Sequence, residues 1–326
     1  MAGSRFAYVR DFELPDPALP DVYLVVRIDG KGFHKFSAAH NFAKPNDAAA
    51  LELMNCAARQ VCSELRGDVV MAFGESDEYS FLLKKDCQLY RRRKTKITTH
   101  IVSLFTSSYV FSWPSYFPQT RLLQPPSFDG RLVEYPTAKH IRDYFAWRQA
   151  DTHVNNLYNT TFWACVLRGG VTEREAHERL RGTVSAQKNE MLFSEFGINY
   201  EREEAMFRKG TTLVWTQEEA NETTTQPAED VHDGLVSSPK GSQQNKRKVK
   251  MKRRLRTLHV DIIGDAFWLE GTAALPATAE AAPAVSGSCA AAAASDTTLP
   301  TSMPSAAPWQ DPDRLEGVGC GRWALA

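Results

Sequence analysis

The sequence predicts an α+β fold of the ferredoxin-like type, in which helices cover one face of an antiparallel sheet. Two observations support this prediction. Within residues 1–138, segments typical of strands and helices follow in the order strand, helix, strand, strand, helix, strand. The 326-residue chain is also 43% hydrophobic, which is enough apolar material for a substantial core.

The predicted elements are separated by clear turn signals. Residues 22–28 (VYLVVRI) form a continuous apolar strand. The next helix begins with Asn46 as its N-cap, keeps apolar residues at helical spacing and ends at Gly67. Residues 69–73 (VVMAF) and 79–83 (YSFLL) then predict a hairpin.

Two further elements complete the predicted sheet and its helical layer. A second helix is expected from Thr95 to about Trp113, where Pro114 ends it. A last strand is expected at residues 131–135. Together these elements give the split β-α-β pattern.

Composition divides the chain into parts of different character. The amino-terminal portion is rich in aromatic and aliphatic residues, whereas later segments are polar or low in complexity. We predict a sheet-containing domain at 1–138, a helical part of the same folded unit at 139–215, a disordered polar loop at 216–256, a docked segment at 257–270 and a disordered tail at 271–326.

The polar loop ends in a basic run, KRKVKMKRRLR (246–256), with eight basic residues in eleven. Such a run is typical of an arm that contacts a nucleic-acid backbone, of a nuclear-import patch, or of a solubilising linker. The sequence leaves all three interpretations open.

Bulk properties narrow the class of protein. The 39 basic and 39 acidic residues balance, so net charge does not indicate a nucleic-acid partner. No apolar run has the length of a signal peptide or a membrane span. The six cysteines are scattered without a C-x-x-C pair. We therefore expect a soluble protein with free thiols from a reducing compartment.

The hairpin turn GESDEYSF (74–81) carries more acid than a turn requires, namely Glu75, Asp77 and Glu78. Asp29 follows the first strand, which neighbours this hairpin in the predicted fold. Two carboxylates brought together repel each other unless a cation lies between them, and Mg²⁺ is the natural occupant of such a site. The alternative is that the acids simply face solvent.

Other segments indicate phosphate or nucleic-acid contact. The glycine-rich turn at 29–32 exposes backbone N–H groups that suit a triphosphate, although it could serve only as a tight turn. His34, Lys35 and Lys44 follow it as a cationic wall or as ordinary surface residues. The run RRRKTK (91–96) favours polyphosphate or RNA contact over a merely solvated helix start.

A third segment, WRQADTHVNNLYNTTFW (147–163), predicts an amphipathic helix with Asp151 or Thr152 at its N-cap. Asparagine is unfavourable inside a helix, but its side chain can form hydrogen bonds with the edge of a base or with a ribose. A similarly mixed helix at 185–200 adds Lys188, as a surface residue or as a ligand contact.

These motifs in this order resemble those of the eukaryotic tRNA-histidine guanylyltransferases. The resemblance rests on RIDGKGFHKF, HNFAKPND, GESDEYSF, FDGR, WRQADTHVNNLYNT, KNEMLFSEFGINY, RKGT and DIIGDAFW. It extends from about Met1 to Trp215 and again from His259 to Trp268. It implies a polymerase palm-like domain that adds nucleotides in the reverse, 3′–5′, direction.

The resemblance also implies roles for individual residues. Two Mg²⁺ ions are expected on Asp29, Asp77 and the backbone carbonyl of Gly30, with Glu78 as an adjacent catalytic acid. The implied nucleotide-binding residues are Asp29, Gly30, Lys31, Gly32, Phe33, His34, Lys44, Asp47, Ser76, Asp77, Arg93 and Lys96, and the implied tRNA contacts are His153, Asn155, Asn156 and Lys188. Glu75 receives no role, and we expect it to face solvent.

The implied reaction uses ATP and GTP as substrates and histidine tRNA as acceptor. The tRNA 5′ phosphate is adenylylated by ATP, the GTP 3′ hydroxyl displaces AMP, and pyrophosphate is then removed. The family further implies a homotetramer and a cytoplasmic protein, with nuclear and mitochondrial pools left open. The alternatives are a template-dependent tRNA 5′-end repair polymerase and a non-catalytic RNA-binding protein.

Overall fold

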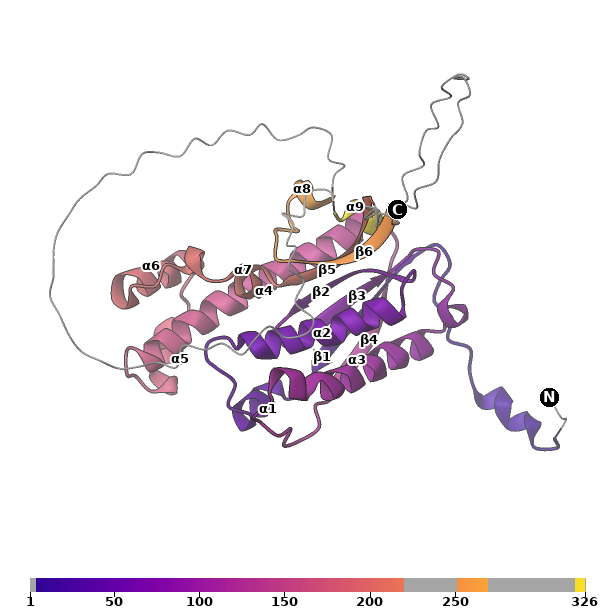
Figure 1. Ribbon diagram of the computed structural model, residues 1–326, viewed down its shortest axis with the longest axis horizontal. Helices are drawn as coiled ribbons and strands as arrows, with labels where there is room; N and C mark the ends of the chain where they lie inside the picture. The colour runs from indigo at the N-terminus through magenta and orange to yellow at the C-terminus, as the bar shows by residue number, and fades with distance from the viewer. Residues whose placement is uncertain (1–3, 220–250, 269–319, 326) are drawn as a thin grey trace, which may run out of the picture.

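The protein is built around an antiparallel sheet, seen in a computed structural model that describes residues 4–219, 251–268 and 320–325 (Figure 1). In these residues the strand order is β4-β1-β3-β2-β5-β6. The predicted α+β class is therefore confirmed. The strands are β1 (Tyr23–Gly30), β2 (Val69–Glu75), β3 (Glu78–Leu83), β4 (Phe128–Tyr135), β5 (Thr211–Glu219) and β6 (Met251–Leu258).

Helices surround this sheet. The α-helices are α1 (Phe33–Ala39), α2 (Ala48–Glu64), α3 (Lys94–Tyr116), α4 (Ala138–Leu167), α5 (Glu173–Leu180), α6 (Ser185–Phe196), α7 (Ala205–Lys209), α8 (Asp265–Trp268) and α9 (Arg322–Leu325). Shorter turns are η1 (Ala7–Phe12), η2 (Leu89–Arg92) and η3 (Tyr200–Arg202). None of the described helices combines the length and the apolar character that a membrane span requires.

Both faces of the sheet are covered, whereas the sequence predicted helices on one face only. The predicted helices α2 and α3 pack side by side on one face, where Leu24, Val26 and Ile28 of β1 join their core (Figure 1). The opposite face, with Val25, packs against α4. Because both faces of β1 are buried, its residues 23–26 are continuously apolar instead of alternating.

Two predicted helix boundaries were wrong. The N-cap of α2 is Asp47, whose side chain accepts the Ala50 N–H at 2.9 Å, and not Asn46. Helix α3 continues through Pro114 to Tyr116, because Trp113 and Tyr116 are buried and hold the last turn on the core.

The predicted start of the amide-rich helix was also wrong. Residues 147–163 lie in the middle of α4, a 30-residue helix whose N-cap is Thr137 and not Asp151 or Thr152. The favourable cap at Thr137, which accepts the His140 N–H, starts the helix earlier than the apolar pattern indicated.

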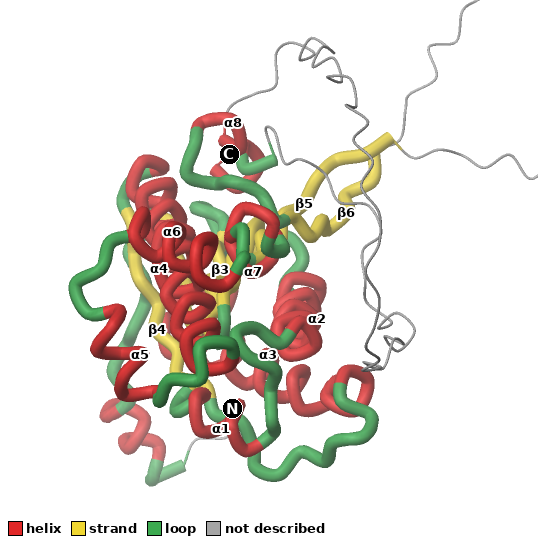
Figure 2. Tube along the Cα trace, turned by 90° about the vertical axis from the view of Figure 1, so that its left-hand side faces the viewer, coloured by secondary structure: helices red, strands yellow, loops and turns green. Residues whose placement is uncertain are grey.

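Part of the predicted polar loop forms strands. Residues 216–219 extend β5 and residues 251–256 open β6, in a hairpin that extends beyond the helices (Figure 2). The register pairs Trp215 with Leu255 and Thr216 with Arg254, so the antiparallel ladder continues into residues that were predicted to form a loop. The basic run thus contributes the edge strand from residue 251, while 220–250 lie outside the described residues.

The carboxyl end of the predicted tail is also structured. Cys320 and Ala324 are buried against Phe267 and Trp268 of α8. The Gly321 N–H donates to the Phe267 carbonyl at 2.8 Å, so the end of the chain returns to the sheet face occupied by α4. The rest of the tail, 269–319, lies outside the described residues. The cysteines of the described ranges, Cys56, Cys62, Cys87, Cys165 and Cys320, are free thiols.

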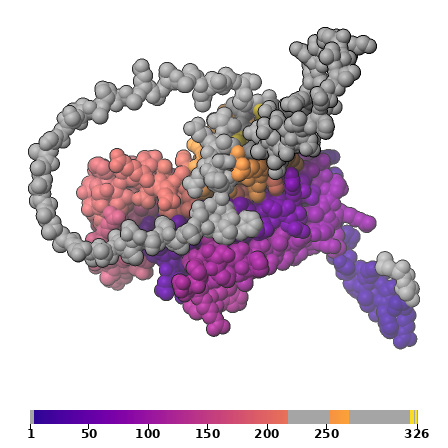
Figure 3. All heavy atoms as spheres, in the orientation of Figure 1, coloured from indigo at the N-terminus to yellow at the C-terminus, as the bar shows by residue number. Residues whose placement is uncertain are grey.

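The amino-terminal segment projects from the body of the protein (Figure 3). Helix η1 buries none of its residues, and Phe12 is 79% exposed. The segment joins the body where Pro17 pairs with Arg93 in a short antiparallel bridge. It therefore contributes little to the core.

The chain makes a left-handed turn before α3. Tyr90, Arg91 and Arg92 have φ angles of 50°, 56° and 60°, a conformation that disfavours residues other than glycine. The buried Arg92 guanidinium holds the turn by donating to four backbone carbonyls, those of Leu19 (2.7 Å), Cys87 (2.9 Å), Val22 (3.1 Å) and Lys85 (3.1 Å). This side chain connects the start of β1 to the start of α3.

Replacing Arg92 with alanine is expected to destabilise the protein by roughly 2–4 kcal/mol, because buried carbonyls lose their donor and the strained turn loses its support. Urea denaturation measures the effect. Arg91→Ala is the matched control, since Arg91 lies in the same turn but is exposed, and a change within about 0.5 kcal/mol is expected. Equal midpoints for the two variants would contradict this role of Arg92.

Candidate active site

The acidic hairpin and the end of β1 meet at one edge of the sheet. Strands β1 and β3 are neighbours, with Asp29 opposite Glu78 in register. The Gly30 N–H donates to the Asp77 carbonyl at 3.0 Å. Ser76 and Asp77 form the turn between β2 and β3, with Ser76 at φ 47°. The predicted proximity of Asp29 and Asp77 is therefore confirmed.

Gly30 makes this close approach feasible. A Cβ atom there would lie 2.3 Å from the Phe33 ring and 2.9 Å from the Asp77 Cβ. Both distances are shorter than van der Waals contact, so a larger residue would push the two acidic segments apart.

The environment of Asp77 favours its protonated form. Burial, and then the charge of Asp29, raises the pKa of the Asp77 carboxyl to about 6. Among the described side chains, no lysine or arginine forms an ion pair with either Asp29 or Asp77. A pair of adjacent carboxylates without a protein cation is suited to a divalent metal ion.

Glu78 is held differently. Its carboxylate accepts from the buried Arg148 of α4 at 3.1 and 3.2 Å and lies 3.8 Å from the Arg27 guanidinium. Burial raises the pKa of Glu78, and the Arg148 charge opposes that shift. Glu78 thus joins the acidic turn to α4 through an ion pair.

The prediction that Glu75 faces solvent was wrong. Glu75 is half-buried and lines the same cavity as Asp77. Burial raises its pKa to about 7, although the neighbouring Thr152 hydroxyl of α4 opposes the shift. The sequence analysis did not place α4 on the second face of the sheet, and α4 covers the end of β2 there.

A cavity of about 740 Å³ opens at these acids, a size typical of small-molecule sites. One wall comes from α1, the α1–α2 loop and α2, and the other from α4 and α5. The predicted site residues that line it are Asp29, Gly30, Gly32, Phe33, His34, Lys44, Asp47, Ser76, Asp77, Glu78, Asn155 and Asn156.

Asp47 has a structural task in this wall. One carboxylate oxygen accepts the Ala50 N–H and the other accepts the Ala43 N–H, both at 2.9 Å. The side chain therefore fixes the α1–α2 loop that carries Lys44. The Lys44 ammonium lies 5.6 Å from the centre of the Trp163 ring on the opposite wall.

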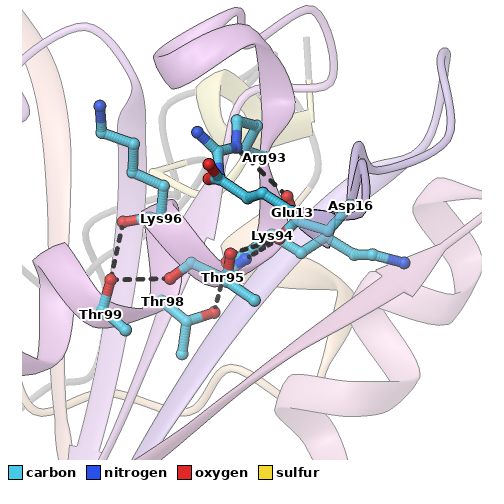
Figure 4. A network of polar contacts seen from close by, with 8 residues as sticks. All are labelled: Glu13, Asp16, Arg93, Lys94, Thr95, Lys96, Thr98 and Thr99. Carbon is cyan, nitrogen blue, oxygen red and sulfur yellow. Dashed lines mark hydrogen bonds and ion pairs between the residues drawn. The ribbon is translucent and has the colours of Figure 1, made fainter. Parts of the chain in front are cut away.

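Two predicted phosphate contacts lie outside the cavity, at the start of α3. Arg93 pairs with Glu13 at 2.8 Å and Asp16 at 3.3 Å, and Asp16 also accepts the Thr95 N–H at 2.7 Å (Figure 4). Hydrogen bonds from Thr95 hold the pKa of Asp16 below its usual value. The Lys96 ammonium lies 4.7 Å from the Tyr90 ring centre. Their phosphate-binding roles stay predictions.

Three other predicted contacts also lie outside the cavity. Lys31 is exposed beside it. His153 packs edge-on against Tyr200, and Lys188 donates to the Thr183 carbonyl at 2.7 Å. Asn156 lines the cavity, but its amide donates to the Tyr200 hydroxyl at 3.0 Å. The nucleotide-binding role of Lys31 and the tRNA-binding roles of His153, Asn156 and Lys188 stay predictions.

The α4–α5 wall contains residues that the sequence analysis did not assign to the site. Those on α4 recur every three or four residues, so they lie on one face of that helix. This spacing is visible in the sequence, but it indicates a site only once α4 is known to lie against the acidic turn. They are Arg148, Asp151, Thr152, Tyr158, Asn159, Phe162 and Trp163, with His177 from α5.

Comparison with known proteins covers both parts of the folded chain. Residues 6–136 match the family model described as tRNAHis guanylyltransferase, and residues 139–264 match the Thg1 C-terminal domain. The chain is 51% identical over 272 residues to tRNA(His) guanylyltransferase of Debaryomyces hansenii, covering 83% of this chain and 98% of that protein. It is 50% identical over 270 residues to the Schizosaccharomyces pombe enzyme of that name, with coverages of 82% and 96%.

Solved structures agree in fold. The crystal structure of the Saccharomyces cerevisiae tRNA(His) guanylyltransferase matches with a TM-score of 0.63 and 50% identity, covering 64% of this chain and 93% of that one. A bacterial Thg1-like protein solved in complex with ATP matches with a TM-score of 0.53 and 22% identity, covering 64% and 85%. The second match concerns the fold alone.

The raised pKa of Asp77 predicts how metal-free stability depends on pH. Its pKa is about 6 in the fold against 3.8 ordinarily, so the ionised carboxyl destabilises the native state above pH 6, by roughly 2–3 kcal/mol, and protonation relieves this as the pH falls. Asp77→Asn should therefore melt at a higher temperature than wild type at pH 8 in EDTA, with a smaller difference at pH 5.

Asp86→Asn, which changes an exposed acid beyond the other end of β3, is the control and should not shift the melting temperature. Added Mg²⁺ should raise the melting temperature of wild type more than that of Asp77→Asn. An Asp77→Asn protein less stable than wild type at pH 8 in EDTA would contradict the electrostatic account.

Proposed function

This chain belongs to the tRNAHis guanylyltransferase family of nucleotidyltransferases, and we propose that it adds a guanylate to the 5′ end of histidine tRNA in the 3′–5′ direction. The observation that carries this proposal is the convergence of Asp29 and Asp77 at the edge of the cavity. A non-catalytic RNA-binding protein would have no need to hold two mutually repelling carboxylates together.

The acids fit the metal ions that the family implies. Their ligand atoms are carboxylate and backbone oxygens, which Mg²⁺ prefers, and burial and the charge of Asp29 raise the pKa of Asp77. Two Mg²⁺ ions held by Asp29, Asp77 and the Gly30 carbonyl would neutralise charge on the reacting phosphates. The paired acids thus define the reacting end of the cavity.

The phosphate-binding elements lie next to these acids. The first turn of α1 leaves backbone N–H groups at Phe33 and His34 without intrahelical acceptors, as every helix start does. Lys44 contributes a positive charge from the α1–α2 loop. These groups orient a triphosphate towards Asp29 and Asp77, and positioning accounts for much of the catalysis in phosphoryl transfer.

The opposite wall is suited to nucleotides of the acceptor. Asn155 and Asn159 are exposed in the cavity, and Tyr158 and Trp163 are half-buried there. Amide side chains bind base edges, and aromatic rings stack on unpaired bases. This wall places a tRNA 5′ end opposite the triphosphate.

The proposed reaction proceeds in three steps. The tRNA 5′ phosphate attacks the α-phosphate of ATP and releases pyrophosphate. The 3′ hydroxyl of GTP then attacks the adenylylated phosphate and expels AMP. Removal of pyrophosphate from the added guanylate leaves a 5′ monophosphate. A homotetramer and a cytoplasmic location complete the proposal, as the family resemblance implies.

Asp29→Ala and Asp77→Ala are each expected to lower guanylylation of histidine tRNA by at least about a hundredfold while leaving tRNA affinity nearly unchanged, because each removes a carboxylate from the reacting centre and none from the α4 wall. Incorporation of labelled GTP and filter binding measure the two quantities. Asp86→Ala is the control and should keep wild-type activity. Full activity in either acid variant would contradict the assignment.

Substrate choice separates histidine tRNA guanylylation from general 5′-end repair. We expect one guanylate to be added to full-length histidine tRNA at a rate at least about tenfold above the extension of 5′-truncated non-histidine tRNAs. The measurement is a primer-extension assay with matched tRNA concentrations. Faster repair of the truncated tRNAs would instead identify a template-dependent 5′-end repair polymerase.

A further inference from the structure

Tyr109 of α3 carries a polar group that the fold leaves without a partner. The side chain is fully buried and belongs to the residues that line the cavity. Among the described residues, no donor or acceptor lies within hydrogen-bonding distance of its hydroxyl. Buried tyrosine hydroxyls nearly always have a partner, so an unpaired one beside a cavity indicates a missing ligand atom.

The position of this hydroxyl is fixed by aromatic packing. The Tyr109 ring lies among the rings of Phe128, Phe33 and Trp113, with centroids 5.8, 6.1 and 6.1 Å away. Because these neighbours come from β4, α1 and α3 itself, the ring cannot turn to another partner without repacking the core. The unpaired hydroxyl of this cavity-lining residue therefore has a fixed position.

The charged neighbours of Tyr109 locate the hydroxyl within the site. Burial, and then the charges of Asp47 and Asp77, raises the pKa of the phenol. Asp77 marks the metal-binding end of the cavity, and Asp47 fixes the α1–α2 loop. Tyr109, Asp47 and Asp77 line the same cavity, which contains both the reacting end and the loop wall.

A nucleoside triphosphate bound here has a defined order of groups. With its phosphates at Asp29, Asp77 and the first turn of α1, the ribose comes next and the base follows along the loop wall. We propose that the Tyr109 hydroxyl forms a hydrogen bond with a ribose hydroxyl of the bound nucleoside triphosphate. This inference rests on the proposed nucleotidyltransferase function and assigns the ribose subsite within it.

The proposal explains why an unpaired hydroxyl is retained in a buried position. Phenylalanine would fill the same space without burying an unsatisfied polar group, and a buried unsatisfied group destabilises the protein. A site that contains a polar group for a substrate hydroxyl discriminates strongly against an analogue that lacks it. The Tyr109 hydroxyl therefore lowers the stability of the free protein and contributes to recognition of a ribonucleotide.

The test compares wild type with Tyr109→Phe in binding GTP, 2′-deoxyGTP and 3′-deoxyGTP in the presence of Mg²⁺, with melting temperatures measured without nucleotide. We expect Tyr109→Phe to bind GTP about tenfold more weakly than the wild type does. The wild type should bind one of the two deoxy analogues more weakly than GTP, and Tyr109→Phe should bind GTP no more tightly than that analogue. We also expect the nucleotide-free variant to melt at or above the wild-type temperature. The analogue that the wild type binds more weakly than GTP lacks the ribose hydroxyl that Tyr109 contacts, and so identifies that hydroxyl.

Tyr116→Phe is the matched control, because Tyr116 lies two turns further along α3 and is not among the described residues lining the cavity. It should bind all three nucleotides as wild type does. Unchanged GTP affinity in Tyr109→Phe, or an equal loss for GTP and both analogues, would overturn the ribose assignment. If the wild type guanylylates tRNA and Tyr109→Phe gives either of these results, only the ribose assignment is overturned. If the wild type binds no triphosphate, the proposed function itself is overturned.

Discussion

The site depends on the pairing of β1 with β3 at the sheet edge where the acidic turn lies. The Gly30 N–H donates to the Asp77 carbonyl, and the absence of a side chain at Gly30 allows the two segments to approach. Antiparallel pairing thereby brings Asp29 and Asp77 together although they lie 48 residues apart in the sequence. Burial, and then repulsion from Asp29, raises the pKa of Asp77, and a bound divalent cation would relieve this unfavourable energy.

Helix α4 converts this acidic edge into a cavity. It covers the second face of the sheet and brings Arg148 against Glu78, so this acid of the turn has an ion-pair partner, whereas no described lysine or arginine pairs with Asp29 or Asp77. The same helix continues beyond the sheet, where its polar and aromatic face forms the wall opposite the α1–α2 loop. One long helix thus connects the reacting centre to the surface proposed for tRNA.

Much of the catalytic edge could be predicted from the sequence, because local signals specify it. The apolar segment before Asp29 and the two strand segments around the acidic turn define a hairpin and its neighbour without knowledge of distant contacts. The position of Glu75, the α4 wall and the strands that continue the sheet as β5 and β6 could not be predicted. The position of Glu75 and the α4 wall depend on which face of the sheet α4 covers. Strands β5 and β6 depend on pairing between segments separated by residues 220–250. Neither the helix placement nor this pairing leaves a local pattern in the sequence.

The most direct test of the account is incubation of the protein with 5′-monophosphorylated histidine tRNA, ATP, labelled GTP and Mg²⁺, followed by mapping of the labelled end. The account predicts a product longer by one guanylate at its 5′ end, formed only when ATP and Mg²⁺ are both present. A tRNA that stays unextended, or a label found at the 3′ end, would contradict it.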